Sequence, residues 1–362
     1  MTRTVARLLA VSAGLHAALM LVPPVSWPLW LARFTAVETS LVPFCTGLVA
    51  VMLTRERWVS VTGALALVVG ITPSLSAIPA YLENTQSFSL LDWFTGSAPE
   101  WSSVQHDVPM GDDVSADIWQ GAGPGPHPAV FVVHGGSWRS GDKGEAPHVS
   151  AALAEAGYTV FDLRYRLAET DPWPAATTDI RCAFAFAAAE SARFGIDPER
   201  LAVLGRSAGG QLALDAAWTS GNACGMPVPE LRAVVSLYGV TDLAWAHDHP
   251  YEPDVVDGVA ATQLYMGGTP DSAREHYDRA SPLFRASASR PPTLLVTGLW
   301  ERCVRPENST RLADALAQRG ATVRLLLIPF AEHGFDIRRG GIGEQLSRGV
   351  LLDFLTQHLA AE

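Results

Sequence analysis

Apolar residues follow two different patterns along this chain, and the pattern changes near residue 82. Before that point they form three long stretches, near residues 5–22, 35–53 and 58–80. After about residue 103 they form short runs separated by amphipathic segments, which predicts alternating strands and helices. The sequence therefore predicts three parts: a helical region over 1–82, a linker over 83–102 and a globular domain over 103–362.

Each of the three long stretches approaches the ~20 residues that a helix needs to cross ~30 Å of hydrocarbon. We therefore expect an all-α transmembrane region of about three helices. The middle stretch is the weakest candidate, because Glu38 and Pro43 lie within it. Two alternatives stay open: the first stretch is a signal peptide behind Arg3 and Arg7, or the middle stretch lies in the membrane interface, which leaves two spans.

The positions of the arginines predict an orientation in a cell membrane. Arg3 and Arg7 precede the first stretch, and Arg55 and Arg57 lie between the second and third, whereas only Arg33 lies between the first and second. Positive charge is enriched on the cytoplasmic side of membrane proteins. With three spans the globular domain is then extracytoplasmic, and with two spans it is cytoplasmic.

The globular part contains eight strand-like segments. They lie near residues 104–108, 114–119, 129–133, 158–164, 201–204, 233–238, 293–297 and 323–328. The first two alternate in polarity and are joined by a turn-rich link, which favours an antiparallel hairpin. The other six are continuous apolar runs, as buried parallel strands are. Helix-like stretches separate most of them, near 147–156, 175–193, 307–319 and 345–358. The pattern predicts an α/β fold with a mostly parallel eight-stranded sheet and helices on both faces.

The passage Gly205-Arg206-Ser207-Ala208-Gly209-Gly210 directly follows the apolar run 201–204. It reads as a strand that turns sharply into a helix with Ser207 at the apex. Such a turn needs glycine or a small residue two positions to either side of the serine, because a Cβ there collides with its neighbours. Gly205 and Gly209 meet that need, which makes Ser207 a candidate nucleophile.

Four passages together resemble the α/β-hydrolases of the esterase and lipase type, in the hormone-sensitive-lipase-like and feruloyl-esterase-like branches. They are His134-Gly135-Gly136-Ser137-Trp138, Tyr165-Arg166-Leu167-Ala168 with Trp173-Pro174-Ala175-Ala176 and Asp179, the turn at Ser207, and Ala331-Glu332-His333-Gly334-Phe335. They occur in the family's order and are spread over most of the region 100–362. The resemblance implies an α/β-hydrolase fold and a serine hydrolase that acts on esters.

Serine at neutral pH is a poor nucleophile and needs a general base. His333 is the candidate, because it follows the last strand and comes late in the chain, as the order nucleophile, acid, histidine requires. The family usually has an aspartate after the seventh strand, and Glu301 occupies that position here. A glutamate can orient and stabilise the histidine equally well, because the role is electrostatic. Asp242, after the sixth strand, and Glu332, beside the histidine, stay open as alternatives.

The expected oxyanion donors are the backbone amides of Gly135, Gly136 and Ala208. The family's longer glycine run is here replaced by Ser137-Trp138, so the third donor of the loop is open. The resemblance implies that His134 braces this loop rather than carrying protons. For Arg206 we expect an ion pair with a neighbouring carboxylate.

The composition argues against some classes of partner. The net charge is −11 with no basic stripe, which argues against a nucleic-acid partner. No cofactor is expected, and His247 and His249 lack the further spaced ligands of a metal site. We expect two unrelated thiols at Cys182 and Cys224, with a disulfide as the alternative.

The sequence thus predicts a membrane-anchored serine carboxylesterase that takes a small acyl-ester or lipid-like substrate. A lipase or deacetylase, an amidase or peptidase, and an acyltransferase on the same scaffold stay open, as does a non-catalytic binding module. The oligomeric state is open too.

Overall fold

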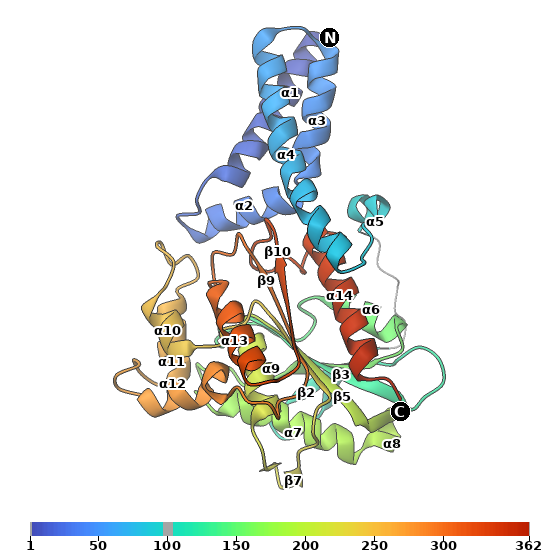
Figure 1. The fold of residues 1–362 in the computed structure, drawn as a ribbon, viewed down its shortest axis with the longest axis vertical. Helices are drawn as coiled ribbons and strands as arrows, with labels where there is room; N and C mark the ends of the chain where they lie inside the picture. Colours follow the sequence, from blue (N-terminus) through green and yellow to red (C-terminus); the bar gives the residue numbers. More distant parts are fainter. Residues whose placement is uncertain (1, 97–103, 362) are drawn as a thin grey trace.

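The computed structural model describes residues 2–96 and 104–361. Its centre is one eight-stranded sheet with the order β1-β2-β4-β3-β5-β8-β9-β10 (Figure 1). The strands are β1 (Val104–Pro109), β2 (Ser115–Trp119), β3 (His127–Val133), β4 (Thr159–Arg164), β5 (Ile196–Arg206), β8 (Ala233–Leu237), β9 (Thr293–Gly298) and β10 (Val323–Ile328). Strand β2 is antiparallel to both neighbours and the other pairs are parallel. The predicted α/β-hydrolase sheet is confirmed.

Alternate residues of each strand point to opposite sides of the sheet. Because the residues on both sides are apolar, helices cover both faces. In β3, Val130 and Val132 belong to one buried cluster, and Phe131 and Val133 belong to the other. The first cluster is covered by α6 (Pro147–Glu155) and α14 (Ile342–His358). The second is covered by α7 (Ala175–Ala189), α8 (Ser191–Phe194), α9 (Ala208–Trp218) and α13 (Glu307–Gln318).

The segment between β8 and β9, residues 238–292, contains helices and no strand. It forms α10 (Leu243–Asp248), α11 (Gly258–Met266), α12 (Arg274–Ala280) and the short 3-10 helix η1 (Pro282–Arg285). A small hairpin of β6 (Asn222–Ala223) and β7 (Met226–Pro227) follows α9. Cys182 on α7 and Cys224 in this hairpin form a disulfide, so the expectation of two unrelated thiols is wrong. Both cysteines lie on neighbouring elements, with Cα atoms 5.5 Å apart.

The N-terminal region forms four helices. They are α1 (Thr2–Leu21), α2 (Trp27–Glu38), α3 (Leu41–Leu53) and α4 (Arg57–Glu83). In Figure 1, α1, α3 and α4 run side by side as a stalk, and α2 lies across its base against the sheet domain. The predicted single helix over 35–53 is wrong: it breaks between α2 and α3, which meet at 67°. Pro43 has no amide hydrogen for the Thr39 carbonyl and its ring clashes there, so the helix cannot continue.

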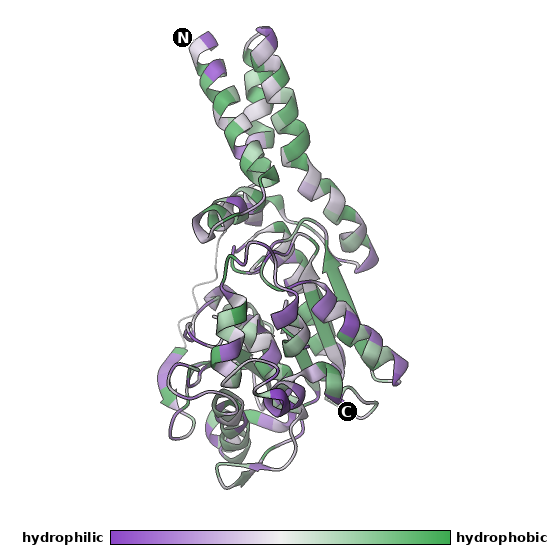
Figure 2. Cartoon of the chain, turned by 90° about the vertical axis from the view of Figure 1, so that its left-hand side faces the viewer, coloured by the Kyte–Doolittle hydropathy of each residue, from purple (hydrophilic) through white to green (hydrophobic). Residues whose placement is uncertain are grey.

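Small residues line the inside of the stalk and large apolar residues point outward. Figure 2 shows that the helices of the stalk are mostly coloured as hydrophobic. Ala6, Ala10 and Ala66 are fully buried, whereas Leu8 and Leu65 are mostly exposed. Two helices, α1 and α4, are long and apolar enough to cross a membrane, and the bent pair of α2 and α3 raises this number to three if it counts as one span.

The polar residues within these apolar stretches have structural contacts. His16 on α1 has its Nε2 3.1 Å from the Ala36 carbonyl oxygen and 3.2 Å from the Thr39 hydroxyl, so it braces the end of α2. Glu38 is buried where α2 meets the sheet domain. The predicted linker contains the short helix α5 (Leu90–Thr95), and its last residues, 97–102, lie outside the described residues.

Candidate active site

Ser207 lies at a sharp turn between the end of β5 and the start of α9, with a backbone φ of 53°. A Cβ at Gly209 would lie 2.3 Å from the carbonyl oxygens of Val133 and His134, and a Cβ at Gly205 would lie 1.9 Å from the Gly209 carbonyl oxygen. Real Cβ atoms do not approach backbone this closely. The two glycines are therefore required by close packing of the strand, the turn and the helix, for the reason that the sequence pattern implied.

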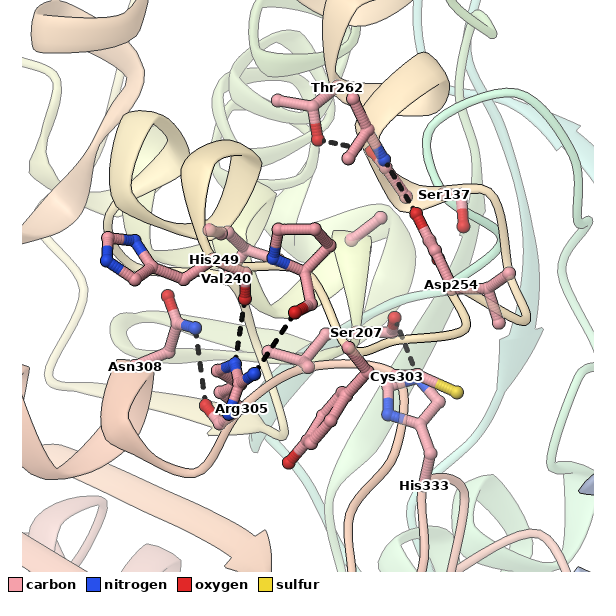
Figure 3. Close-up of a pocket in the computed structure, with 18 of the residues that line it drawn as sticks. Ser137, Ser207, Val240, His249, Asp254, Thr262, Cys303, Arg305, Asn308 and His333 are labelled. Carbon is pink, nitrogen blue, oxygen red and sulfur yellow. Dashed lines mark hydrogen bonds between the residues drawn. The ribbon is translucent and has the colours of Figure 1, made fainter. Parts of the chain in front are cut away.

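His333 lies in the loop after β10 and faces Ser207 (Figure 3). Its Nε2 is 2.9 Å from the Ser207 Oγ, and its Nδ1 is 2.9 Å from the Glu301 Oε2. Glu301 is buried in the loop after β9, where its Oε1 accepts hydrogen bonds from the amides of Cys303 at 2.7 Å and Val304 at 3.0 Å. The structure thus joins the three predicted residues in one continuous hydrogen-bonded relay.

The electrostatic surroundings of His333 favour its protonated form. Burial by itself lowers the pKa of this histidine, but the Glu301 carboxylate, supported by Glu332 and Glu145, outweighs the burial and holds the pKa above its ordinary value. Burial and the neighbouring Glu301 raise the pKa of Glu332 to about 7. A base whose protonated form is stabilised in this way is suited to take a proton from a serine hydroxyl.

The two alternative acids have other contacts. Asp242 caps α10 by accepting a hydrogen bond from the Trp245 amide at 3.1 Å, and it pairs with Arg311 at 2.8 Å. Glu332 accepts a hydrogen bond from the His333 amide at 3.2 Å, and its other oxygen contacts Arg33. The only carboxylate bonded to the His333 ring within the described part of the chain is Glu301.

The loop after β3 lies beside the Ser207 turn. Gly136, Ser137 and Trp138 all have positive φ, and a Cβ at Gly136 would lie 2.0 Å from the Ser140 carbonyl oxygen. The Gly135 amide donates a hydrogen bond to Glu145 Oε2 at 3.0 Å. This amide, one of the three expected oxyanion donors, is therefore already hydrogen-bonded in the structure.

The remaining amides of this region are available. Within residues 2–96 and 104–361, the amides of Gly136, Ser137 and Ala208 have no hydrogen-bond acceptor. Ser137 and Ala208 line the same pocket as Ser207. The sequence analysis did not name the Ser137 amide as a candidate oxyanion donor. The position of Ser137 directly after Gly135 and Gly136 was the signal that could have indicated it.

His134 has the bracing role that the resemblance implied. Its Nδ1 donates to the Gly135 carbonyl oxygen at 2.8 Å, and its ring stacks on Tyr165 with centroids 4.2 Å apart. The Tyr165 hydroxyl in turn donates to the His134 carbonyl oxygen at 2.9 Å. These contacts fix the loop that precedes the Gly136 and Ser137 amides.

Arg206, next to the nucleophile, is buried and pairs with Asp336 at 2.5 Å, so the predicted ion pair is confirmed. The Tyr238 hydroxyl donates to the other oxygen of Asp336, and the Tyr238 ring lies 4.5 Å from the His333 ring. Sequence reasoning missed Asp336 and Tyr238. Asp336 stands three residues after His333, but nothing local indicates that it turns toward Arg206.

Ser207 and His333 open into a pocket that encloses about 680 Å³ of empty space, its mouth included. Its far wall comes from the 243–291 segment and the start of α13 (Figure 3). Trp245, His249 and Tyr251 line it, and Arg305 ties this wall down by donating to the carbonyl oxygens of His249 at 2.7 Å and Pro250 at 3.0 Å.

Metal-ligating side chains gather at one place within the described ranges: atoms of Glu301, Cys303 and His333 lie within 4.8 Å of one another. Glu301 and His333 are already bonded to each other there. His247 is bonded to Asp248 and Gln263, and the His249 ring donates to the Trp245 carbonyl oxygen.

Comparison with known proteins identifies the family. The sequence model of the BD-FAE family matches residues 117–316, which is more than half of the chain. The chain belongs to the BD-FAE family. This match includes the β3 loop, the Ser207 turn and the Glu301 loop, whereas His333 lies beyond its end.

Two curated relatives of this BD-FAE chain come from Mycobacterium tuberculosis (strain ATCC 25618 / H37Rv). A probable carboxylic ester hydrolase, LipM, is 30% identical over 234 residues, which cover 61% of this chain and 53% of LipM. The esterase LipC is 30% identical over 263 residues, which cover 69% of this chain and 64% of LipC. The BD-FAE chain therefore spans between half and two thirds of the length of these relatives.

Solved structures agree with the fold of the BD-FAE chain. An esterase of Pyrobaculum calidifontis superposes with a TM-score of 0.63 at 22% identity, covering 80% of this chain and 94% of that one. The esterase LipW of Mycobacterium marinum superposes with a TM-score of 0.59 at 22% identity, covering 80% of this chain and 87% of LipW. At this identity the likeness establishes the α/β-hydrolase fold alone.

Proposed function

We propose that this protein is a membrane-anchored serine hydrolase that cleaves carboxylic esters through an acyl-enzyme. The observation that carries the proposal is the relay from Ser207 Oγ through His333 to Glu301, with both ring nitrogens of the histidine at 2.9 Å. The relatives named as ester hydrolases support the choice of ester bonds.

In the first half of the reaction, Ser207 Oγ attacks the ester carbonyl carbon while His333 Nε2 takes the hydroxyl proton. Glu301 holds the Nδ1 hydrogen of His333 and stabilises the charged ring that forms. His333 then gives the proton to the leaving alcohol as the carbon–oxygen bond breaks, which leaves an acyl group on Ser207. In the second half, His333 takes a proton from a water molecule as its oxygen attacks the acyl carbon. His333 then returns that proton to Ser207 Oγ as the Oγ–carbon bond breaks, which releases the carboxylic acid and restores Ser207.

The negative charge on the carbonyl oxygen needs donors that point at it. We assign this role to the amides of Gly136, Ser137 and Ala208, which replace the expected set of Gly135, Gly136 and Ala208. The Ala208 amide has the N-terminus of α9 behind it, which adds a favourable dipole. Loss of one such donor costs about 3 kcal/mol of transition-state stabilisation.

The substrate is a small acyl ester or a lipid-like ester. A pocket that opens onto Ser207 and has the apolar rings of Trp245 and Tyr251 in its wall suits the acyl or alcohol part of such an ester. Lipase or deacetylase, amidase or peptidase, and acyltransferase chemistry use the same relay and differ in leaving group and acceptor. A panel of acyl esters, amides and acceptor alcohols offered to the full-length protein in its membrane separates these reactions.

We place the stalk in a cell membrane, with the sheet domain on the extracytoplasmic side. Arg7 near the start of α1 pairs with Glu56 in the turn between α3 and α4, so the arginines of both segments lie on one side. Figure 1 shows the N-terminus at the end of the stalk that lies away from the sheet domain. The chain then crosses three times, through α1, through the bent pair of α2 and α3 taken as one span, and through α4. The disulfide between Cys182 and Cys224 supports this side, because disulfides persist in oxidising compartments.

The test begins with Ser207→Ala in the full-length protein. Hydrolysis of a short-chain p-nitrophenyl ester should fall by at least about 10⁴-fold, and labelling by a fluorophosphonate probe should disappear. Full activity in this variant contradicts the proposal. Wild-type protein that resists the probe favours a non-catalytic binding module instead.

A second pair of variants tests the acid. Glu301→Gln should lower kcat by about 10⁴-fold, because a neutral amide favours the wrong tautomer of His333. Asp242→Asn is the matched control, because it removes the charge of the alternative acid while keeping a helix cap. It should retain most of the activity, and the reverse result would move the acid to Asp242.

A further inference from the structure

One side chain of the N-terminal helices reaches into the neighbourhood of the active site. Arg33 on α2 donates from Nη1 to Glu332 Oε2, and the two side chains are 5% and 0% exposed. Glu332 is the residue directly before His333, and its other oxygen accepts the His333 amide at 3.2 Å. Helix α2 thus binds the Glu332 carboxylate through Arg33, and this carboxylate in turn accepts a hydrogen bond from the backbone of His333.

The same arginine also contacts the loop of the candidate acid. Its guanidinium carbon lies 4.9 Å from the ring centre of Trp300, the residue directly before Glu301. Trp300 in turn packs on Phe330, with ring centroids 4.3 Å apart, and its amide donates to the Ala331 carbonyl oxygen at 3.0 Å. Arg33 therefore touches the neighbour of the acid and the neighbour of the base.

The two loops that it touches are packed tightly against each other. A Cβ at Gly298 would lie 2.1 Å from the Ala331 carbonyl oxygen, so the loops after β9 and β10 cross in direct contact. The Glu301–His333 bond lies just beyond this crossing. A shift of either loop changes the distance between acid and base.

We propose that Arg33 is a positioning residue for the Glu301–His333 pair, through which the membrane-proximal helix α2 completes the active site. This rests on the proposed function, because it assigns a role within that relay. Arg33 touches neither substrate nor the reacting atoms, and acts through Glu332 and Trp300. Arginine suits the task, since its planar group can bond a carboxylate and stack on an aromatic ring at the same time.

The charges around these groups fit the assignment. His333 faces Glu301 from the β9 loop, Glu332 from its own loop and Glu145 from the segment after β3. Glu332 faces Glu301, Arg33 and His333, and Arg33 also faces Arg302. Burial raises the pKa of Glu332 and Arg33 opposes that rise, so the arginine helps to keep a buried carboxylate ionised beside the histidine.

The primary variant is Arg33→Met with Glu332→Gln, in the full-length protein in nanodiscs. Arg33→Met alone would leave a buried charge without its partner, so the double variant is used because it removes both charges together. Hydrolysis of a water-soluble short-chain ester should show a kcat lower by roughly 10- to 100-fold at unchanged KM, since a small misplacement of catalytic groups costs rate rather than binding. Arg33→Lys should fall between this variant and the wild type.

The pH profile gives a second readout. Removing the Glu332 charge lowers the pKa of His333, so the acid limb of kcat/KM should move to lower pH in the double variant. Arg7→Ala, which breaks an exposed ion pair at the far end of the stalk, is the matched control and should change neither kcat nor the acid limb.

Three results overturn the proposal: a folded double variant with wild-type kcat and acid limb, a KM change in place of a kcat change, or an equal kcat loss in Arg7→Ala. Failure of the proposed function is seen separately, as wild-type protein that does not react with the fluorophosphonate probe. A wild type that reacts, with a double variant that reacts equally fast, rejects only the role of Arg33.

Discussion

The sheet domain and the N-terminal stalk bury opposite kinds of side chain. In the domain, large apolar residues such as Leu204 and Phe131 are fully buried. In the stalk, alanines such as Ala66 are buried while Leu8 and Leu65 are 67% and 63% exposed. The domain therefore gains its stability in water by removing apolar surface from solvent. The stalk has close helix contacts and an apolar exterior, which is the arrangement of helices packed in lipid.

Both regions nevertheless use glycine where backbones approach each other. Gly209 lies against the carbonyl oxygens of Val133 and His134, and Gly63 on α4 lies against the carbonyl oxygen of Gly47 on α3. In the domain the contact joins a strand end to the Ser207 turn, and neither can move without moving the nucleophile. In the stalk it joins α3 and α4, neither of which carries Ser207, Glu301 or His333. The same substitution should therefore have very different consequences.

The largest effect is expected for Gly209→Ala. Its Cβ would lie 2.3 Å from two backbone oxygens, so the turn must shift and displace Ser207 from His333. We expect kcat/KM for a soluble ester to fall by about 100-fold or more. Gly63→Ala, with a Cβ 2.9 Å from the Gly47 oxygen, is the matched change and should alter kcat/KM by less than roughly twofold, because the shift that it forces lies between α3 and α4 and involves neither Ser207 nor His333. Equal losses in both variants would contradict the comparison.

A leucine pair sharpens the same contrast through stability. Leu204→Ala removes a fully buried side chain of β5 and should cost 2–5 kcal/mol, so thermal unfolding of the domain should shift down by roughly 5–15 °C. Leu65→Ala on α4 removes an exposed side chain and should change stability by no more than about 0.5 kcal/mol. Both are measured in the same detergent. A large loss from Leu65→Ala would mean that this face of the stalk packs against protein.

The sequence was most informative where structure depends on local pattern. The continuous apolar runs predicted the parallel strands, because strands covered on both faces carry apolar residues on both sides. The spacing of Gly205, Ser207 and Gly209 predicted the turn for the steric reason seen in the structure. Pro43 was visible within the middle stretch, but the continuous apolar character of 35–53 concealed the break that this proline causes.

Contacts between distant segments could not be predicted in this way. Arg33 and Glu332 are separated by 299 residues, and neither has a neighbouring pattern that selects the other. The bond from the Gly135 amide to the Glu145 carboxylate, ten residues further along the chain, engages an expected oxyanion donor, and no local pattern indicates it. The disulfide between Cys182 and Cys224 likewise depends on where the β6–β7 hairpin folds back.

The smallest expected effect is a shift in the pH dependence of activity, caused by the buried Glu301 carboxylate beside His333. Only the neutral imidazole can take the Ser207 proton, so activity rises as pH passes through the pKa of His333. Because Glu301 outweighs burial and raises that pKa, the acid limb of kcat/KM should lie above the ordinary value of about 6.5. The effect on stability has the opposite sign: the folded protein binds this proton more tightly, so the contribution of His333 is complete below about pH 6.5 and is lost as pH rises through the raised pKa. The limb is measured with a soluble ester, with His106→Gln on the outer strand β1 as the control that should leave it in place. A limb at or below the ordinary value would mean that burial, rather than Glu301, governs the proton on His333.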